Sequence, residues 1–168
     1  MAVDAERLTG LAPVIDQRAR VLILGSFPST ASLTAQQYYA HPQNQFWRVL
    51  GAVTGQPLRD MDYPARIAAV QAAGIAIWDI YSSCERAGSL DAAIRDAREN
   101  NLAHLKESAP ALRRICFNGR TAARRIREVE AMGFEALILP STSPAHAGMR
   151  FEEKLARWHR GLSQDKRL

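Results

Sequence analysis

The sequence has 168 residues, of which 47% are hydrophobic, and 22 Lys and Arg residues face 17 Asp and Glu residues, for a formal net charge of +5. This length and apolar content predict one domain over 1–168 with a buried core of about 21–162. No apolar run is long enough to span a membrane, and the charged segment MAVDAERLTG is unlike a secretory signal, so we expect a cytoplasmic protein with no membrane partner.

Four short apolar runs alternate with helical patterns along the chain. The runs are nearly continuous in Ile, Leu and Val, which is typical of parallel strands covered on both faces; they are VLILG (21–25), IAIWDI (75–80), RICFNG (114–119) and ALILP (136–140). The helical patterns fall at 46–55, 64–74, 102–114, 120–133 and 151–162, with Gly133 expected just past the end of the fourth. This alternation predicts an α/β fold with right-handed crossovers.

The cysteines and arginines bear on whether the protein has disulfides, a metal cluster or a polyanion-binding surface. Cys84 and Cys116 are too few for a disulfide framework or a four-thiolate metal cluster, so both are predicted to be free thiols, Cys116 within a buried strand. Six arginines form either a solvated helix face or a footprint for a polyanion, and charge alone does not decide between them; they are Arg113, Arg114, Arg120, Arg124, Arg125 and Arg127.

The segments that follow the four strands are the candidate site, because ligands of parallel sheets bind outside the carboxyl ends of the strands. The first, GSFPSTAS (25–32), has neither the spacing of a dinucleotide site, nor the lysine of a phosphate loop, nor the GxSxG pattern of a serine hydrolase. It is therefore either an ordinary strand-to-helix turn or a turn whose backbone amides face a ligand.

The last of these segments, PSTSPAHAG (140–148), has hydroxyl side chains between two prolines. Proline fixes φ and removes a donor, so the remaining N–H groups are presented in a fixed pattern that suits a phosphate. His146 can reach a ligand from here, although a lone loop histidine is more often a plain surface residue.

The segment YYAHPQNQFW (38–47) concentrates aromatic rings and one asparagine after the first turn. Asn44 is either the cap of a helix that begins near Phe46 or a ligand-binding amide. The aromatic side chains either belong to the hydrophobic core or form a flat wall against which a ligand can stack. A wall beside an amide that both donates and accepts is what a nucleobase requires.

In this order, GSFPS-x-x-S, YYAHPQNQFW, GIAIWDI with SC-x-R-x-GSLD, FNG and LPSTSPAHA resemble the uracil-DNA glycosylase superfamily, and within it the hypoxanthine-DNA (deoxyinosine) glycosylase branch, from Val21 to Trp158. The resemblance implies a three-layer α/β/α sandwich around a central four-stranded parallel sheet. It also implies a monofunctional DNA glycosylase that needs no metal or cofactor, acts as a monomer on damaged DNA, and associates with the nucleoid while doing so. The substrates it implies are hypoxanthine, then uracil or xanthine.

The resemblance also assigns residues. Other branches carry an asparagine in the first motif, where this chain has GSFPS, so the catalytic amide maps onto Asn44 and the base-stacking wall onto Phe46. Asp79 either reads the N1–H of hypoxanthine or N3–H of uracil, or caps a turn, and His146 lies in the motif that presses on the minor-groove side of the lesion. The expected base pocket is Gly25, Ser26, Phe27, Pro28, Phe46, Asp79 and Asn118, and the expected DNA contacts are Ser29, Tyr39, His41, Arg120, Ser141, Thr142, Ser143, Pro144 and His146.

Two other functions remain compatible with the same pattern. The chain can be a nucleic-acid-binding relative without catalytic activity, or an N-glycosidase that acts on free nucleosides or nucleotides.

Overall fold

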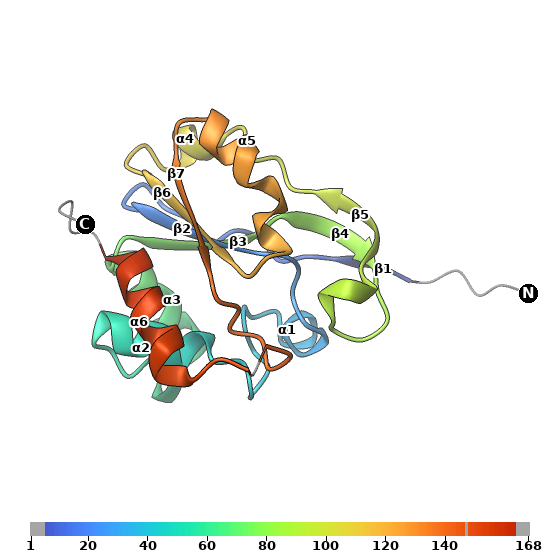
Figure 1. Cartoon of the computed structure of the whole chain (residues 1–168), viewed down its shortest axis with the longest axis horizontal. Helices are drawn as coiled ribbons and strands as arrows, with labels where there is room; N and C mark the ends of the chain where they lie inside the picture. The colour runs from blue at the N-terminus through green and yellow to red at the C-terminus, as the bar shows by residue number, and fades with distance from the viewer. Residues whose placement is uncertain (1–5, 147, 164–168) are drawn as a thin grey trace, which may run out of the picture.

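The computed structural model describes residues 6–146 and 148–163, so the ends of the predicted 1–168 domain and residue 147 lie outside the described residues. At its centre is a four-stranded parallel sheet in the order β3-β2-β6-β7 (Figure 1). Its strands match the four apolar runs to within about a residue and pair in register; they are β2 (Val21–Gly25), β3 (Ile75–Asp79), β6 (Arg114–Asn118) and β7 (Glu135–Leu139). The predicted fold class is confirmed.

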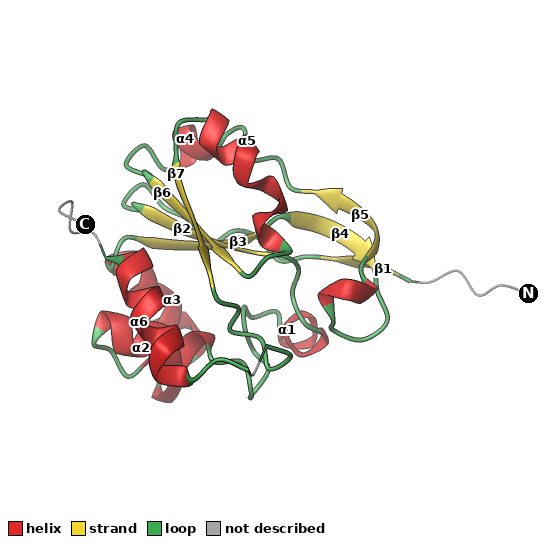
Figure 2. Ribbon diagram, viewed as in Figure 1, coloured by secondary structure: helices red, strands yellow, loops and turns green. Residues whose placement is uncertain are grey.

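Helices cover both faces of this sheet (Figure 2). On one face lie α2, α3 and α6, and on the other α4 and α5. The helices are α1 (Thr30–Ala35), α2 (Phe46–Thr54), α3 (Tyr63–Ala72), α4 (Leu105–Ser108), α5 (Ile126–Ala131) and α6 (Phe151–Leu162), with 3-10 turns η1 (Leu58–Asp60), η2 (Asp91–Ala93) and η3 (Ala122–Arg125). Within the described ranges, no helix has the length and apolarity needed to cross a membrane.

The continuous apolar runs are explained by two cores, one on each face. Successive residues of β2 point to opposite sides, so Val21 packs with the cluster around α2 and α6 while Leu22 packs with the cluster under α5. Both faces being covered, every residue of this strand is buried.

Local sequence signals account for most helix ends, and for one error in the prediction. Gly133 takes φ +94° just past α5, as expected. The predicted helix at 102–114 is wrong in its extent, because the helix there spans only Leu105–Ser108. Pro110 explains this: the residue before a proline avoids helical geometry, and Ala109 has φ −139° and ψ 81°.

A second sheet was not predicted. It is antiparallel in the order β1-β4-β5 and lies beyond the end of β3 (Figure 1), with β1 (Arg7–Thr9), β4 (Tyr81–Glu85) and β5 (Arg95–Glu99). All five residues of β5 are exposed, so its sequence, RDARE, carries no apolar signal. The SC-x-R-x-GSLD segment begins in β4 and continues as a loop into η2, where Arg86 and Asp91 bind the turn between β2 and α1.

The two cysteines behave as expected. Cys84 and Cys116 are both free and buried, and Cys116 lies inside β6.

Candidate active site

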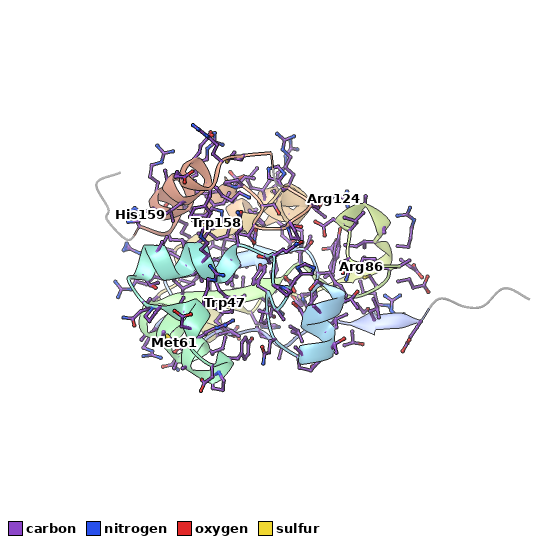
Figure 3. All side chains as sticks on the ribbon, turned by 90° about the horizontal axis from the view of Figure 1, so that it is seen from below. Trp47, Met61, Arg86, Arg124, Trp158 and His159 are labelled. Atoms are coloured by element: carbon purple, nitrogen blue, oxygen red, sulfur yellow. The ribbon has the colours of Figure 1, made fainter. Side chains whose placement is uncertain are left out.

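The predicted site residues gather at the carboxyl ends of the parallel strands. Gly25 ends β2 and begins a buried turn of Ser26, Phe27 and Pro28, while Asp79 ends β3 and Asn118 ends β6. Figure 3 views the molecule from below Figure 1; there Arg86 and Arg124 lie on the side of the antiparallel sheet, away from Trp47 and Trp158.

Asp79 is a buried carboxyl with an unsatisfied oxygen. Its Oδ2 is buried and has no hydrogen-bond partner among the described residues. Burial, followed by the negative charge of Asp91, raises the pKa of Asp79 to about 7, against the opposing charge of Arg86. Buried polar atoms are nearly always paired, so an orphan oxygen at a ligand edge indicates a partner that comes from outside the protein.

Gly25 leaves the space in which this carboxyl lies. A Cβ atom built on Gly25 would come within 2.5 Å of Asp79 Oδ1 and 2.9 Å of the Tyr39 hydroxyl oxygen. These distances are shorter than a real Cβ tolerates, so glycine is required here by close approach. Burial, followed by the charge of Asp79, raises the pKa of Tyr39 above its usual range.

Tyr39, rather than Phe46, is the outer ring of the aromatic wall. Phe46 is fully buried and makes T-shaped ring contacts with Trp47 and Trp158. Tyr39 stacks on Phe46, with ring centroids 3.8 Å apart and ring planes 17° apart. The expected base-stacking face of Phe46 is therefore covered in this structure. Tyr39 has φ +55°, a conformation uncommon for an aromatic residue, which indicates that its surroundings hold it in place.

Asn118 and Thr142 fasten the last loop to the sheet. Asn118 Nδ2 donates to Thr142 Oγ1 at 3.0 Å and to the Tyr39 hydroxyl at 3.3 Å, and Asn118 Oδ1 accepts from Thr142 N at 3.0 Å. Thr142, expected to contact DNA, is fully buried and is unable to do so in this conformation. Asn118, expected to face the base, has its amide engaged in positioning Thr142 and Tyr39.

Asn44 caps the start of α2 and still has a free donor. Its Oδ1 accepts from Phe46 N at 2.9 Å, whereas Nδ2 has no hydrogen-bond partner among the described residues. The neighbouring Gln45 N donates to Thr142 O at 3.0 Å, which joins this segment to the last loop. The side chain is half-buried. The oxygen of Asn44 therefore serves the helix start, as one interpretation expected, and the ligand-binding role of its Nδ2 stays a prediction.

Lys154 ties the loop before α2 and the loop after β7 to α6, and this was not predicted. Its side chain is buried, and Nζ donates to Gln45 Oε1 at 2.9 Å and to His146 O at 3.2 Å. Burial lowers the pKa of this ammonium group. A signal was present in the sequence, because position 154 shares the apolar face of α6 with Phe151 and Trp158 by helical spacing.

The remaining predicted DNA contacts lie in turns at the same edge. The hydroxyls of Ser141 and Ser143 accept from Ser143 N at 3.1 Å and Ala145 N at 3.2 Å, which stiffens the loop, while Pro144 and His146 are exposed. Ser29 caps α1 by accepting from Ser32 N at 3.1 Å, and His41 Nδ1 accepts from Gln43 N at 3.1 Å.

The six clustered arginines do not form one surface. Arg114 donates to two backbone carbonyls at the end of α6 and pairs with Glu135, at the opposite end of β6 from the site. Arg125 is buried and pairs with glutamates, whereas Arg120, after β6, and Arg124, which donates to the Tyr81 hydroxyl at 3.4 Å, are exposed. The expected contact of Arg120 with a polyanion therefore stays a prediction, and the six arginines together do not form a surface that supports it.

The loop between β4 and η2 contributes residues that sequence reasoning quoted only as a motif. Arg86 is buried and donates from Nη2 to Pro28 O at 2.6 Å and from Nε to Gly88 O at 2.9 Å. Its Nη1 is buried and has no partner among the described residues. Asp91 Oδ1 accepts from Ser26 Oγ at 2.6 Å. The loop is therefore fastened to the turn that follows β2.

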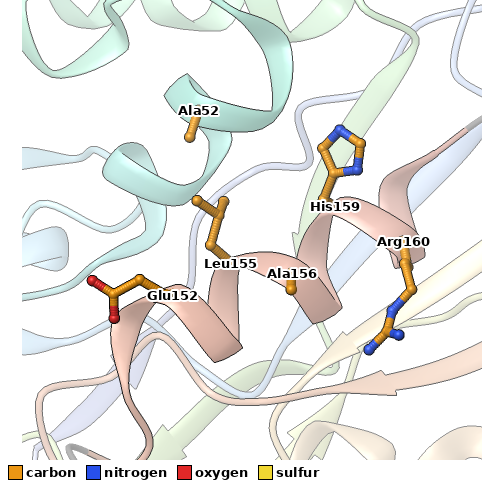
Figure 4. A pocket seen from close by; sticks show the side chains of 6 residues that line it. All are labelled: Ala52, Glu152, Leu155, Ala156, His159 and Arg160. Atoms are coloured by element: carbon orange, nitrogen blue, oxygen red, sulfur yellow. The ribbon is translucent and has the colours of Figure 1, made fainter.

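Other concave or charged features lie away from this edge. A surface hollow of about 470 Å³ lies between α2 and α6 (Figure 4) and includes none of the predicted site residues; its lining is Ala52, Glu152, Leu155, Ala156, His159 and Arg160. In the part of the chain that the structure describes, no three His, Cys, Asp or Glu side chains are grouped as metal ligands.

Known proteins resemble the chain over most of its length. The sequence model of the family described as the uracil DNA glycosylase superfamily matches residues 12–162. Two relatives named hypoxanthine DNA glycosylase, from Methanosarcina acetivorans and Methanosarcina barkeri, are 42% and 39% identical over 137 residues, which is 82% of this chain and 87% of each relative. The solution NMR structure of a candidate uracil DNA glycosylase from Methanosarcina acetivorans has a TM-score of 0.86 and 37% identity, and the match covers 94% of this chain and 97% of that one.

Proposed function

Since the chain belongs to the uracil DNA glycosylase superfamily, we propose that it is a monofunctional DNA glycosylase that removes deaminated bases, with hypoxanthine as its preferred substrate and uracil and xanthine as further ones. The observation that carries this proposal is the buried, unpaired Oδ2 of Asp79 at the carboxyl edge of the sheet. The other oxygen of this carboxyl, Oδ1, lies beside Gly25, at the edge where a parallel sheet binds its ligand.

Asp79 would distinguish hypoxanthine from adenine, and uracil from cytosine, by one proton. Guanine, the parent of xanthine, already carries hydrogen on N1, so this contact does not separate that pair. Adenine N1 and cytosine N3 are acceptors, whereas hypoxanthine N1 and uracil N3 carry hydrogen. An ionised Asp79 accepts from that N–H and has nothing to accept from the parent base at the same position. With a pKa of about 7, the carboxyl is ionised on the alkaline side of neutrality and, when protonated, can donate to the neighbouring carbonyl of the base.

Asn44 is the proposed catalytic amide. A glycosylase must first extrude the nucleotide from the stack, which is less costly at a mispaired base. As the C1′–N bond breaks, its electron pair leaves with the base, C1′ gains positive charge, and a water oxygen bonds to C1′ and releases a proton. The free Nδ2 of Asn44 and the backbone amides of the β2–α1 turn would stabilise the negative charge on the departing base. The second lone pair of Oδ1 would orient the water.

DNA would lie across the loops at this edge. The exposed Pro144 and His146 and the exposed Arg120 are the proposed backbone contacts. Such contacts hold the duplex in register without reading its sequence. Lys154 and Asn118 would then serve as positioning residues, because they fasten the loops that carry these groups.

A lesion panel tests this proposal. Labelled oligonucleotides with one deoxyinosine, deoxyuridine or deoxyxanthosine are incubated with protein and treated with alkali, which breaks the strand at an abasic site. Asn44→Ala should reduce turnover by about 10² or more. Asn44→Asp keeps the cap acceptor for Phe46 N but removes the donor, so it should lose comparable activity at nearly unchanged stability.

The exposed neighbour Gln43 supplies the matched control, since Gln43→Ala removes an amide from the same segment. Its turnover should equal that of the wild type. No break at any lesion would refute the glycosylase assignment, and full activity of Asn44→Asp would move the chemistry away from this side chain. Release of base from free inosine at a comparable rate would favour a nucleoside N-glycosidase instead.

A further inference from the structure

Two arginine side chains are buried among the described residues, and only one of them has a counter-ion. Arg86 and Arg125 are each 8% exposed. Arg125 pairs with two carboxylates, since its Nε lies 3.0 Å from Glu99 Oε2 and its Nη2 lies 2.7 Å from Glu128 Oε1. In the part of the chain that the structure describes, no carboxylate pairs with Arg86, and its guanidinium group donates to two neutral carbonyl oxygens. A buried cation without a counter-ion is costly, so stability alone does not explain Arg86.

Arg86 packs against the turn between β2 and α1, which begins at the proposed base site. Its Nη2 donates to Pro28 O at 2.6 Å, and its Cζ lies 5.3 Å from the centre of the Phe27 ring. Its Nη1 is buried and has no hydrogen-bond partner among residues 6–146 and 148–163. Gly25, at the start of the turn, lies beside Asp79 Oδ1. The cation is therefore fixed next to the edge where the base would bind.

The turn has its carbonyl groups bonded within the protein and two of its amide groups free. The carbonyl oxygens of Gly25 and Ser26 accept from the backbone N–H groups that come just after β3, at 2.8 and 3.2 Å. Arg86 holds the carbonyl of Pro28 in the same way. The N–H groups of Ser26 and Phe27, in contrast, have no partner among the described residues. Because both residues are buried, these donors are left for a group that comes from outside the protein.

The titratable groups around Arg86 lie on three different elements. They are Cys84 of β4, Asp91 of η2 and Asp79 of β3. Burial lowers the pKa of Arg86, against the opposing effect of these three groups. Burial and then Asp91 raise the pKa of Asp79, and the charge of Arg86 opposes them. An ionised Asp79 and a departing base both add negative charge here, and a fixed cation favours both.

We propose that Arg86 is a positioning residue of the excision reaction, which holds the β2–α1 turn with its free amides toward the base and keeps a positive charge beside the place where negative charge develops. This deepens the proposed glycosylase function and rests on it. The electron pair of the C1′–N bond leaves with the base, and Arg86 exchanges no proton or other atom in that step. A charge that is fixed before the reaction costs no reorganisation during it, which is why such groups act strongly in a site that excludes water.

The pH dependence of excision tests this inference on whichever deaminated base the wild type removes fastest. Rates are measured in single turnover from about pH 5 to about pH 9. Arg86→Met removes the cation and its donors, and it should lose about tenfold or more in rate. Its affinity for DNA should change little, because the side chain is buried. The half-maximal rate on the acidic side should move to higher pH, because Asp79 loses the cation that favours its ionised form. Arg86→Lys keeps the charge and should keep the wild-type midpoint.

Arg125→Met is the matched control, because it removes an equally buried arginine whose charge is already paired. It should lower the thermal midpoint of unfolding and leave the midpoint of the pH–rate profile unchanged. If circular dichroism shows Arg86→Met unfolded, Arg86→Gln takes its place, since it keeps an N–H donor for Pro28 O without the charge.

Two results would overturn the role of the charge and leave the glycosylase intact. One is a neutral variant of Arg86 with the wild-type rate, and the other is a loss of rate that is the same at every pH, which a purely structural role would give. A wild-type protein that removes none of the three deaminated bases would overturn the proposed function itself, and this inference with it.

Discussion

Asp79→Asn should change how stability depends on pH, by an amount that follows from the burial of the carboxyl. The pKa of Asp79 is raised from 3.8 to about 7 in the folded protein. The folded state therefore binds the proton more tightly than the unfolded state, so stability is highest at low pH and falls as pH rises from about 4 to about 7. Three pKa units correspond to about 4 kcal/mol, lost in full only above the folded pKa.

Part of that loss is already present at pH 5, where the unfolded carboxyl is largely ionised. Between pH 5 and pH 8 the wild type should lose about 2–3 kcal/mol relative to Asp79→Asn, which has no proton to release. Urea unfolding at both pH values measures this change. Burying the amide of the variant lowers its free energy of unfolding by an amount that does not depend on pH. The test is therefore how the difference in unfolding free energy between the two proteins changes with pH.

Asp60→Asn, which removes the carboxylate of an exposed aspartate in η1, is the control and is measured by urea unfolding at the same two pH values. If Asp79→Asn and the wild type keep a constant difference between pH 5 and pH 8, Asp79 is not a buried acid of raised pKa. The proposal that the unpaired oxygen of Asp79 binds the base would then lose its electrostatic support.

Three other substitutions test the site from different directions. Gly25→Ala should cost about 1–3 kcal/mol in urea unfolding and abolish base excision, because the new methyl group meets Asp79 and Tyr39; near-wild-type activity would contradict the close approach. Lys154→Met should remain folded by circular dichroism yet lose about 10- to 100-fold in turnover, since two loops lose their common donor; unchanged turnover would make the lysine purely structural. Arg120→Ala should reduce by about one the slope of log affinity for DNA against log salt concentration, measured by fluorescence anisotropy, and an unchanged slope would remove this arginine from the DNA contact.

The parallel sheet and its ligand edge could be predicted because their signals are local. Continuous apolar runs mark strands buried on both faces, and the carboxyl ends of such strands meet at one edge whatever the details of packing. Asn44 was correctly placed at the start of a helix, where its oxygen accepts from Phe46 N. The sequence allowed its Nδ2 to be free, but whether this donor has a partner depends on which residues the fold brings near it.

The errors concern features that depend on contacts between distant segments. Phe46 and Thr142 have side chains typical of a binding wall and a phosphate loop, yet both are fully buried. Phe46 packs against the nearby Tyr39 and Trp47 and the distant Trp158, and Thr142 is held by Asn118. The antiparallel sheet escaped detection because β5 is exposed and polar. Arg86 and Asp91 could be recognised in the sequence only as part of a motif. Their contacts with Pro28 and Ser26 could not be predicted, because these partners are brought near by tertiary folding.

The contact between Lys154 and Gln45 spans 109 residues of sequence. During synthesis the chain emerges from its amino end, so the segment with Asn44 leaves the ribosome long before α6 does. Until that last helix docks, the loop with Asn44 and the loop that follows β7 lack the shared Lys154 donor and are joined by the hydrogen bond from Gln45 N to Thr142 O. Docking of α6 would therefore be a late step in the assembly of this site, because the segment with Asn44 is synthesised well before α6.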